Sequence, residues 1–181
     1  MRRKIFACFT CLVIVLVWSC GHNGSTKDLE GAENRILQQE DGTISLKLEK
    51  AVCYNDAVNP SNNTADWNVV ISKPGRFKVW LSSSTKDTSD LSYANSVRIS
   101  LLDDRLVADP ACDKIVQNSG DVSYPYFRAD SFMGSFYVSE PGEYNIQVIS
   151  EKVIAETVGI QNTSLADDTK LMSVMLTPIL R

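Results

Sequence analysis

Residues that could perform catalysis are few in this sequence and are not grouped as catalysis requires. The single histidine, His22, lies in a stretch typical of a tether, which excludes mechanisms that need a histidine base or several histidine ligands inside the fold. No G-x-S-x-G, H-E-x-x-H or P-loop string is present. A glycosidase needs two carboxylates set apart across a cleft, whereas the pairs Asp103-Asp104 and Asp167-Asp168 are adjacent and typical of solvated turns. We therefore expect a protein that is not an enzyme, with a small glycoside hydrolase as an alternative.

Aromatic side chains are the better candidates for function, because a ring stacks on the apolar face of a sugar while planar polar groups hold its hydroxyls. Trp80 points, by strand alternation, away from the apolar side chains Phe77 and Val79, whereas Trp67 shares the parity of its apolar neighbours and is expected in the core. The segment 124–130 adds tyrosines, an arginine and an aspartate around a proline. Packing of these rings within the fold is the alternative. The candidate ligand-binding residues are Trp80, Tyr93, Tyr124, Tyr126 and Arg128.

The elements that must position these side chains are short β-strands. Apolar residues recur at every second position in seven segments, which is typical of strands with one buried face. These segments are 44–49, 67–71, 77–81, 97–101, 132–138, 144–149 and 171–176. The stretch 82–95 is polar and is expected to be a loop, and only 151–160 is compatible with a helical turn or two. The pattern predicts an all-β sandwich of about eight strands.

Two Pro-Gly pairs occur in equivalent surroundings. Residues 71–81 and 138–148 each contain a strand end, a Pro-Gly pair and a strand that begins with an aromatic residue. Proline fixes φ at the first central position of a type II turn and glycine accepts the positive φ of the second. We therefore expect two equivalent hairpins within one sandwich.

Length and composition fit a single domain with an ordinary core. The chain has 181 residues, 44% of them hydrophobic and 22% charged, which excludes a disordered, collagen-like, coiled-coil or polytopic membrane protein. Its 18 basic residues are outnumbered by 22 acidic ones, with a net charge of -4 and no long basic run. A nucleic-acid partner is therefore not expected.

The N-terminus has the pattern of an export signal. A cationic start, Met1 to Lys4, precedes an apolar run of fourteen residues, Ile5 to Trp18, which is short for a membrane-spanning helix. Val17-Trp18-Ser19-Cys20 resembles the lipobox of bacterial lipoproteins, a resemblance that implies cleavage before Cys20 and acylation of its sulfur. A plain secretory signal or a membrane anchor is the alternative. We expect a signal peptide at 1–19, a lipidated cysteine and polar tether at 20–40, and a β-sandwich domain at 41–181.

Cysteine usage agrees with an oxidising compartment. Of the five cysteines, Cys8 and Cys11 would leave with the signal and Cys20 would carry lipid. Cys53 and Cys112 remain, and they either form a disulfide or stay as two separate thiols.

The segment Trp67 to Leu81, with its Pro-Gly pair, resembles part of galactose-binding-like jelly rolls, which include carbohydrate-binding modules and accessory domains of bacterial glycosidases. With the lipobox, this resemblance implies a lipoprotein of the Bacteroidetes type, anchored by its lipid in the cell envelope at the outer membrane. Related jelly rolls often hold a structural calcium, for which Glu49 and Asp167 or Asp168 occupy loosely similar places, while no other cofactor is expected. The expected function is non-catalytic binding of a glycan or glycoconjugate, with a protein–protein assembly subunit of an envelope complex as the alternative.

Overall fold

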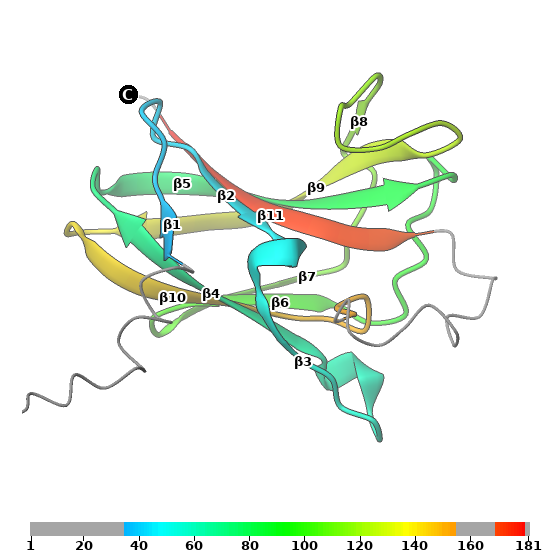
Figure 1. Cartoon of the computed structure of the whole chain (residues 1–181), viewed down its shortest axis with the longest axis horizontal. Coiled ribbons are helices and arrows are strands. Elements are labelled where there is room, and N and C mark those ends of the chain that lie inside the picture. Colours follow the sequence, from blue (N-terminus) through cyan, green and yellow to red (C-terminus); the bar gives the residue numbers. More distant parts are fainter. Residues whose placement is uncertain (1–34, 155–168, 180–181) are drawn as a thin grey trace, which may run out of the picture.

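The computed structural model describes residues 35–154 and 169–179, and this part of the chain is built from two β-sheets. Figure 1 shows the sheets as two layers facing one another. Sheet A contains β1 (Arg35–Leu37), β3 (Val52–Tyr54), β4 (Thr64–Ile71), β6 (Val97–Leu101), β7 (Asp104–Ala108) and β10 (Gly142–Ile149). Sheet B contains β2 (Ile44–Lys47), β5 (Gly75–Thr85), β8 (Lys114–Val116), β9 (Phe127–Val138) and β11 (Lys170–Pro178). Two short 3₁₀ turns, Leu48–Lys50 and Pro60–Asn62, complete the regular structure of the described residues.

The strand order is that of a jelly-roll β-sandwich, which confirms the predicted fold class. Sheet A runs β1-β4-β10-β6-β7 with β3 also beside β4, and sheet B runs β2-β11-β5-β9-β8. The described residues hold eleven strands, more than the eight or so predicted, because β1, β3, β7 and β8 have three to five residues each and lack a long alternation. The strand β1 also begins six residues ahead of the domain boundary placed at residue 41.

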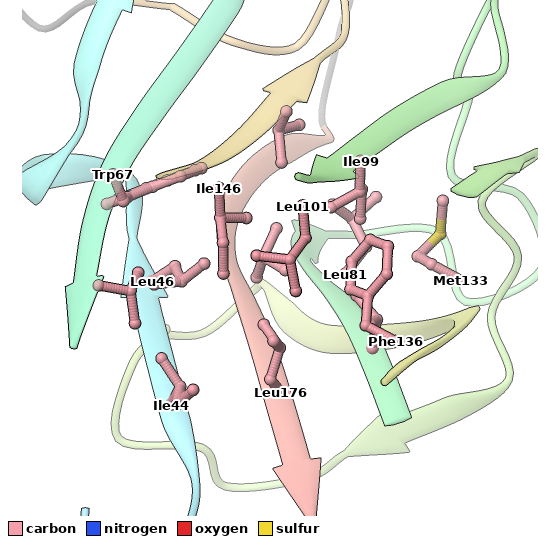
Figure 2. Packing of buried hydrophobic residues seen from close by; sticks show 14 of the residues in the cluster. Ile44, Leu46, Trp67, Leu81, Ile99, Leu101, Met133, Phe136, Ile146 and Leu176 are labelled. Carbon is pink, nitrogen blue, oxygen red and sulfur yellow. The ribbon is translucent and has the colours of Figure 1, made fainter. Parts of the chain in front are cut away.

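The core lies between the two sheets and is formed by the alternating apolar residues (Figure 2). Trp67 is 2% exposed, as predicted, and its indole nitrogen donates a hydrogen bond to the Lys47 carbonyl at 2.9 Å. Each such large apolar side chain contributes about 1.5–3 kcal/mol when it is fully buried. The largest buried side chains are Trp67, Phe77, Phe136, Ile44, Leu46, Ile71 and Leu81.

The two Pro-Gly pairs do not close hairpins, and that prediction was wrong. The pair at 74–75 joins β4 of sheet A to β5 of sheet B, and the pair at 141–142 joins β9 of sheet B to β10 of sheet A. Both are therefore crossovers between the sheets. They lie next to one another, because β4 pairs with β10 and β5 pairs with β9. Strands on both sides of each crossover carry core residues, so turning into the second sheet lets both buried faces meet.

Candidate functional site

A cavity of about 290 Å³ lies on the outer face of sheet B. This volume is at the lower end of the range for small-molecule sites. The 3₁₀ turn after β2 and the loop before β9 form parts of its wall. The lining residues are Ser45, Lys47, Leu48, Glu49, Ser82, Gly120, Asp121, Arg128, Met172, Ser173 and Met175.

The strand register arranges the outward side chains of sheet B in rows. One row, which we call the aromatic row, runs Ser45, Met175, Trp80, Phe132 across β2, β11, β5 and β9. The next, which we call the polar row, runs Lys47, Ser173, Ser82, Asp130 across the same strands. The two rows are consecutive on one face because outward residues recur at every second position of a strand. Ser45 and Met175 of the aromatic row line the cavity together with three residues of the polar row, whereas Trp80 and Phe132 lie further along the aromatic row and are not among the lining residues.

A β-bulge in β9 sets this arrangement. Val79 pairs with Gly134 but Trp80 pairs with Phe132, so Met133 is the additional residue. A shift of one residue moves every later side chain to the opposite face of a strand. Without the bulge, Phe132 would therefore point into the core, whereas the bulge turns it outward beside Trp80 and buries Met133 (4% exposed).

Trp80 and Phe132 form an aromatic pair on this outer surface. Their ring centroids are 5.3 Å apart and the ring planes are inclined by 57°, a geometry that is favourable for aromatic contacts. Phe132 is 45% exposed, and Trp80 is half-buried. Packing against Phe132 fixes the orientation of Trp80 while part of each ring surface stays open to solvent.

A chain of charged groups lies at the cavity, and Lys47, Asp121 and Arg128 belong to its lining. The Arg128 guanidinium donates two hydrogen bonds to the Asp130 carboxylate, Nε to Oδ1 at 2.8 Å and Nη2 to Oδ2 at 3.0 Å. Its Nη1 donates to Asp121 at 3.1 Å, and the Lys47 ammonium lies 3.9 Å from the same carboxylate. The Ser82 hydroxyl donates to Asp130 at 2.7 Å. Arg128 is therefore fixed in position at the cavity wall.

The electrostatics of Arg128 and Asp130 follow from this pairing. The hydrogen bonds to Asp130 raise the pKa of the Arg128 guanidinium above its usual value, against the opposing effect of burial, and Asp121 adds to the increase. Asp130 is 2% exposed, and a charge at such a depth is tolerated only when it is paired and hydrogen-bonded. The Arg128–Asp130 pair is thus a fixed polar group on the same sheet face as the Trp80–Phe132 pair.

The predicted ligand-binding residues are only partly brought together. Trp80 and Arg128 lie on the outer face of sheet B, in neighbouring parts of one surface. Tyr93 packs against the core cluster and its hydroxyl is 2.9 Å from that of Ser83. The ring of Tyr126 is covered by the Lys86 ammonium, 5.0 Å from its centroid. Tyr124 is 92% exposed and is not among the lining residues of the cavity.

Several residues of this surface were missed by the sequence reasoning. Phe132 and Asp130 appeared only as parts of longer segments, and Lys47 and Asp121 were not selected at all. Asp130 could have been found because it is two residues from Arg128 and therefore on the same face of the strand. The bulge that turns Phe132 outward is indicated in the sequence only by Gly134.

The two remaining cysteines lie on different sheets. Cys53 is in β3 of sheet A and Cys112 precedes β8 of sheet B, and Figure 1 shows these strands on opposite sides of the molecule. A disulfide between them would require Cα atoms within about 7 Å, and this placement does not bring the two residues together. Burial, together with the nearby carboxylates Asp87, Asp90 and Asp113, raises the pKa of the Cys112 thiol.

Of the suggested calcium ligands, only Glu49 belongs to the described residues. Glu49 is exposed in the 3₁₀ turn after β2, and Asp167 and Asp168 lie outside the described residues. In residues 35–154 and 169–179, no three histidine, cysteine or acidic side chains gather into a metal-binding group.

The predicted signal peptide, Cys20 and most of the tether also lie outside the described residues. Within the part that the structure describes, no helix has the length and apolar character needed to cross a membrane.

Fold and surface together define a jelly-roll sandwich with a polar cavity and an aromatic pair on one sheet. No protein-family model matches the sequence, and no curated protein matches it. Among solved structures, the fold is similar to part of an alpha-L-fucosidase from Vibrio sp. strain EJY3, with a TM-score of 0.63 and 22% identity over 82% of this chain. A GH26-CBM35 beta-(1,4)-mannanase from Podospora anserina aligns with a TM-score of 0.45 and 9% identity over 78% of the chain. The chain spans 24% of the fucosidase and 29% of the mannanase.

Proposed function

We propose that the outer face of sheet B binds a glycan or glycoconjugate without cleaving it, and that a lipid on Cys20 holds the protein at the cell envelope. The observation that carries the proposal is that the Trp80–Phe132 pair lies in the row of outward residues next to the row that holds Asp130, the partner of Arg128, on the sheet face that carries the cavity. The likeness of the fold to part of a fucosidase fits a carbohydrate ligand.

The two kinds of side chain match the two surfaces of a sugar ring. The apolar face of a pyranose packs on an exposed aromatic ring, and its equatorial hydroxyls accept from or donate to planar charged groups. Because Trp80 and Arg128 are already held in place by their neighbours, little side-chain entropy is lost when a ligand binds.

The charges at the cavity favour a ligand without multiple negative charges. The lining contains two cationic residues, Lys47 and Arg128, and two anionic ones, Glu49 and Asp121. Both cations are within 4 Å of Asp121, and Asp130 adds a further negative charge behind Arg128. No excess positive charge is therefore left for a polyanion.

A lack of catalysis is part of the proposal. Asp130 is buried and accepts hydrogen bonds from Arg128 and Ser82, so it is poorly placed to attack a sugar. Incubation of the protein with any glycan that it binds should leave the chain length of that glycan unchanged, and release of shorter sugars would instead indicate the glycoside hydrolase.

The proposal is tested by measuring retention on a glycan array and in affinity gels. We expect Trp80→Ala and Phe132→Ala each to weaken binding about tenfold or more, the equivalent of about 1.4 kcal/mol of lost stacking. Tyr137→Ala is the matched control, because Tyr137 is an exposed aromatic residue (61%) on the same strand but further from the cavity. Equal binding by the wild type, W80A and F132A would overturn the proposal. A pull-down that returns one stoichiometric protein partner regardless of added sugar would favour the assembly subunit.

A further inference from the structure

The outer face of sheet A carries a second polar surface, on the opposite side of the sandwich. Asn68 of β4 pairs in register with Asn145 of β10, and Asp66 pairs with Gln147. These four side chains point away from the core because they alternate with buried residues of the same strands. We call this group the amide platform. Planar amides and carboxylates set on a rigid sheet are suited to hydrogen bonds with sugar hydroxyls.

Two cavities lie on this platform and share residues. One, of about 140 Å³, is lined by residues of β1, β4 and β10, and the other, of about 170 Å³, by residues near and in β3 together with β4 and β10. Asn68 and Asn145 line both. The cavities are thus neighbours along one surface, flanked by the edge strands β1 and β3, which pair with successive parts of β4.

The polar groups of the platform are incompletely satisfied within the protein. The Asp66 Oδ1 atom is buried and receives no hydrogen bond from any described residue. The Asn145 amide donates only a long hydrogen bond, 3.4 Å, to the Trp67 carbonyl. This oxygen has already lost its hydration on folding, so ligand binding adds little further desolvation cost. It is therefore a strong acceptor for a hydroxyl that enters the cavity.

The charges around the platform cancel in pairs. Arg35 forms an ion pair with Glu143 at 3.1 Å in the smaller cavity, and Lys50 and Asp66 both line the larger one. Tyr54, 59% exposed, adds an aromatic ring at the rim of the larger cavity. The surface therefore matches an uncharged ligand with many hydroxyls and one apolar face.

We propose that the amide platform is a second glycan-binding surface, which takes a neutral oligosaccharide of at least two sugar units across β3, β4 and β10. It shares the ligand class of the proposed function but uses none of the residues of sheet B. Because the two surfaces lie on opposite faces of the sandwich, one molecule would hold two glycan segments at the same time.

The test uses an array of neutral and uronate-containing oligosaccharides with the chain lacking residues 1–19 of the sequence and with three variants. We expect W80A/F132A to lose the affinity of the sheet B surface but to keep the affinity of the amide platform for neutral oligosaccharides. We expect N68A/N145A to lower the affinity of the amide platform by about tenfold or more and to keep that of the sheet B surface. Val107→Ala is the control, because Val107 is an exposed residue on β7 of the same sheet, at its far edge. Urea-unfolding midpoints show whether the variants are folded. We expect them to be unchanged for N68A/N145A, because Asn68 and Asn145 are both exposed.

Each outcome separates the two proposals. Loss of all binding in W80A/F132A, with no effect of N68A/N145A, overturns the second surface and leaves the first. Loss only in N68A/N145A supports the second surface and overturns the first. Binding restricted to uronate-containing glycans overturns the neutral ligand class, and no binding to any glycan overturns both. As a direct readout, titration with the retained neutral oligosaccharide should shift the side-chain amide NMR signals of Asn68 and Asn145, and unshifted signals would contradict the proposal.

Discussion

Asp130 is the residue on which the polar wall of the sheet B cavity depends. It is buried, it accepts two hydrogen bonds from Arg128, and it accepts a third from Ser82. Such a pair contributes little net stability when it is intact, because desolvation of two charges offsets their attraction. Its contribution is geometric, since it fixes the guanidinium and with it the position of Asp121 on the adjoining loop.

Removal of the charge of Asp130 should therefore be costly. We expect Asp130→Asn to lower the free energy of unfolding by about 2–4 kcal/mol, because Arg128 loses its buried counterion and keeps only the exposed Asp121. Urea unfolding followed by tryptophan fluorescence measures the effect. Asp103→Asn, at an exposed turn residue, is the control and should change stability by less than about 0.5 kcal/mol. A loss for D130N no greater than that of the control would contradict the assigned role.

At the scale of the elements, the long strands could be predicted from the sequence, but the crossovers that join them and the bulge that bends β9 could not. Alternation revealed the strands around Trp67, Val79, Ile99 and Ile146 because each has one buried and one open face. The short edge strands contain too few residues for alternation to be distinguished from chance. The Pro-Gly crossovers were read as hairpins, because a turn motif specifies the local change of direction but not which sheet the next strand enters.

The candidate site was predictable only in part for the same reason. Strand parity was enough to turn Trp80 outward. It could not place Phe132, whose direction depends on a bulge, nor join Lys47 and Asp121 to Arg128, since those contacts bring together residues that are distant along the chain. The tyrosines were overvalued because composition alone does not distinguish a ring that packs on the core, like Tyr93, from one at a cavity.

The bulge itself depends on Gly134. Its φ is 129°, a conformation that other residues rarely adopt, and a Cβ at this position would lie 2.9 Å from a methyl group of Leu106 on the facing sheet. We expect Gly134→Ala to cost about 2–4 kcal/mol of stability from backbone strain and overpacking, and to weaken glycan retention by moving Phe132.

A double-mutant cycle with Leu106→Ala separates the two causes. The double variant G134A/L106A should be less destabilised than the sum of the two single variants, because truncation of Leu106 relieves the contact but not the strain. Urea unfolding measures the three variants. Additive losses would show that the contact with Leu106 is not responsible, and an unchanged midpoint for G134A would show that the bulge does not need glycine.

On the scale of the whole molecule, two polar surfaces on opposite faces of one sandwich are compatible with the proposed attachment through the N-terminus. With a tether before β1, neither sheet would need to face the membrane, so both the sheet B cavity and the amide platform would be open to glycans. Two weak sites on one anchored molecule, and many such molecules on one membrane, would retain a polysaccharide far longer than a single site does.

The proposed lipid anchor can be tested because the charge of the protein does not provide another way to bind a membrane. Without residues 1–19 the chain carries 15 basic and 22 acidic residues, so it has no electrostatic attraction to an anionic membrane, and the acyl chains would supply the binding at about 0.8 kcal/mol per buried methylene. We therefore expect the processed protein to enter the detergent phase on Triton X-114 partition and to stay on membranes in 1 M salt, and Cys20→Ser to move to the aqueous phase with its fold unchanged. Cys53→Ser is the matched control and should remain in the detergent phase. Salt-dependent release of the wild type, or detergent partition of C20S equal to that of C53S, would show that the protein is held by something other than a lipid on Cys20.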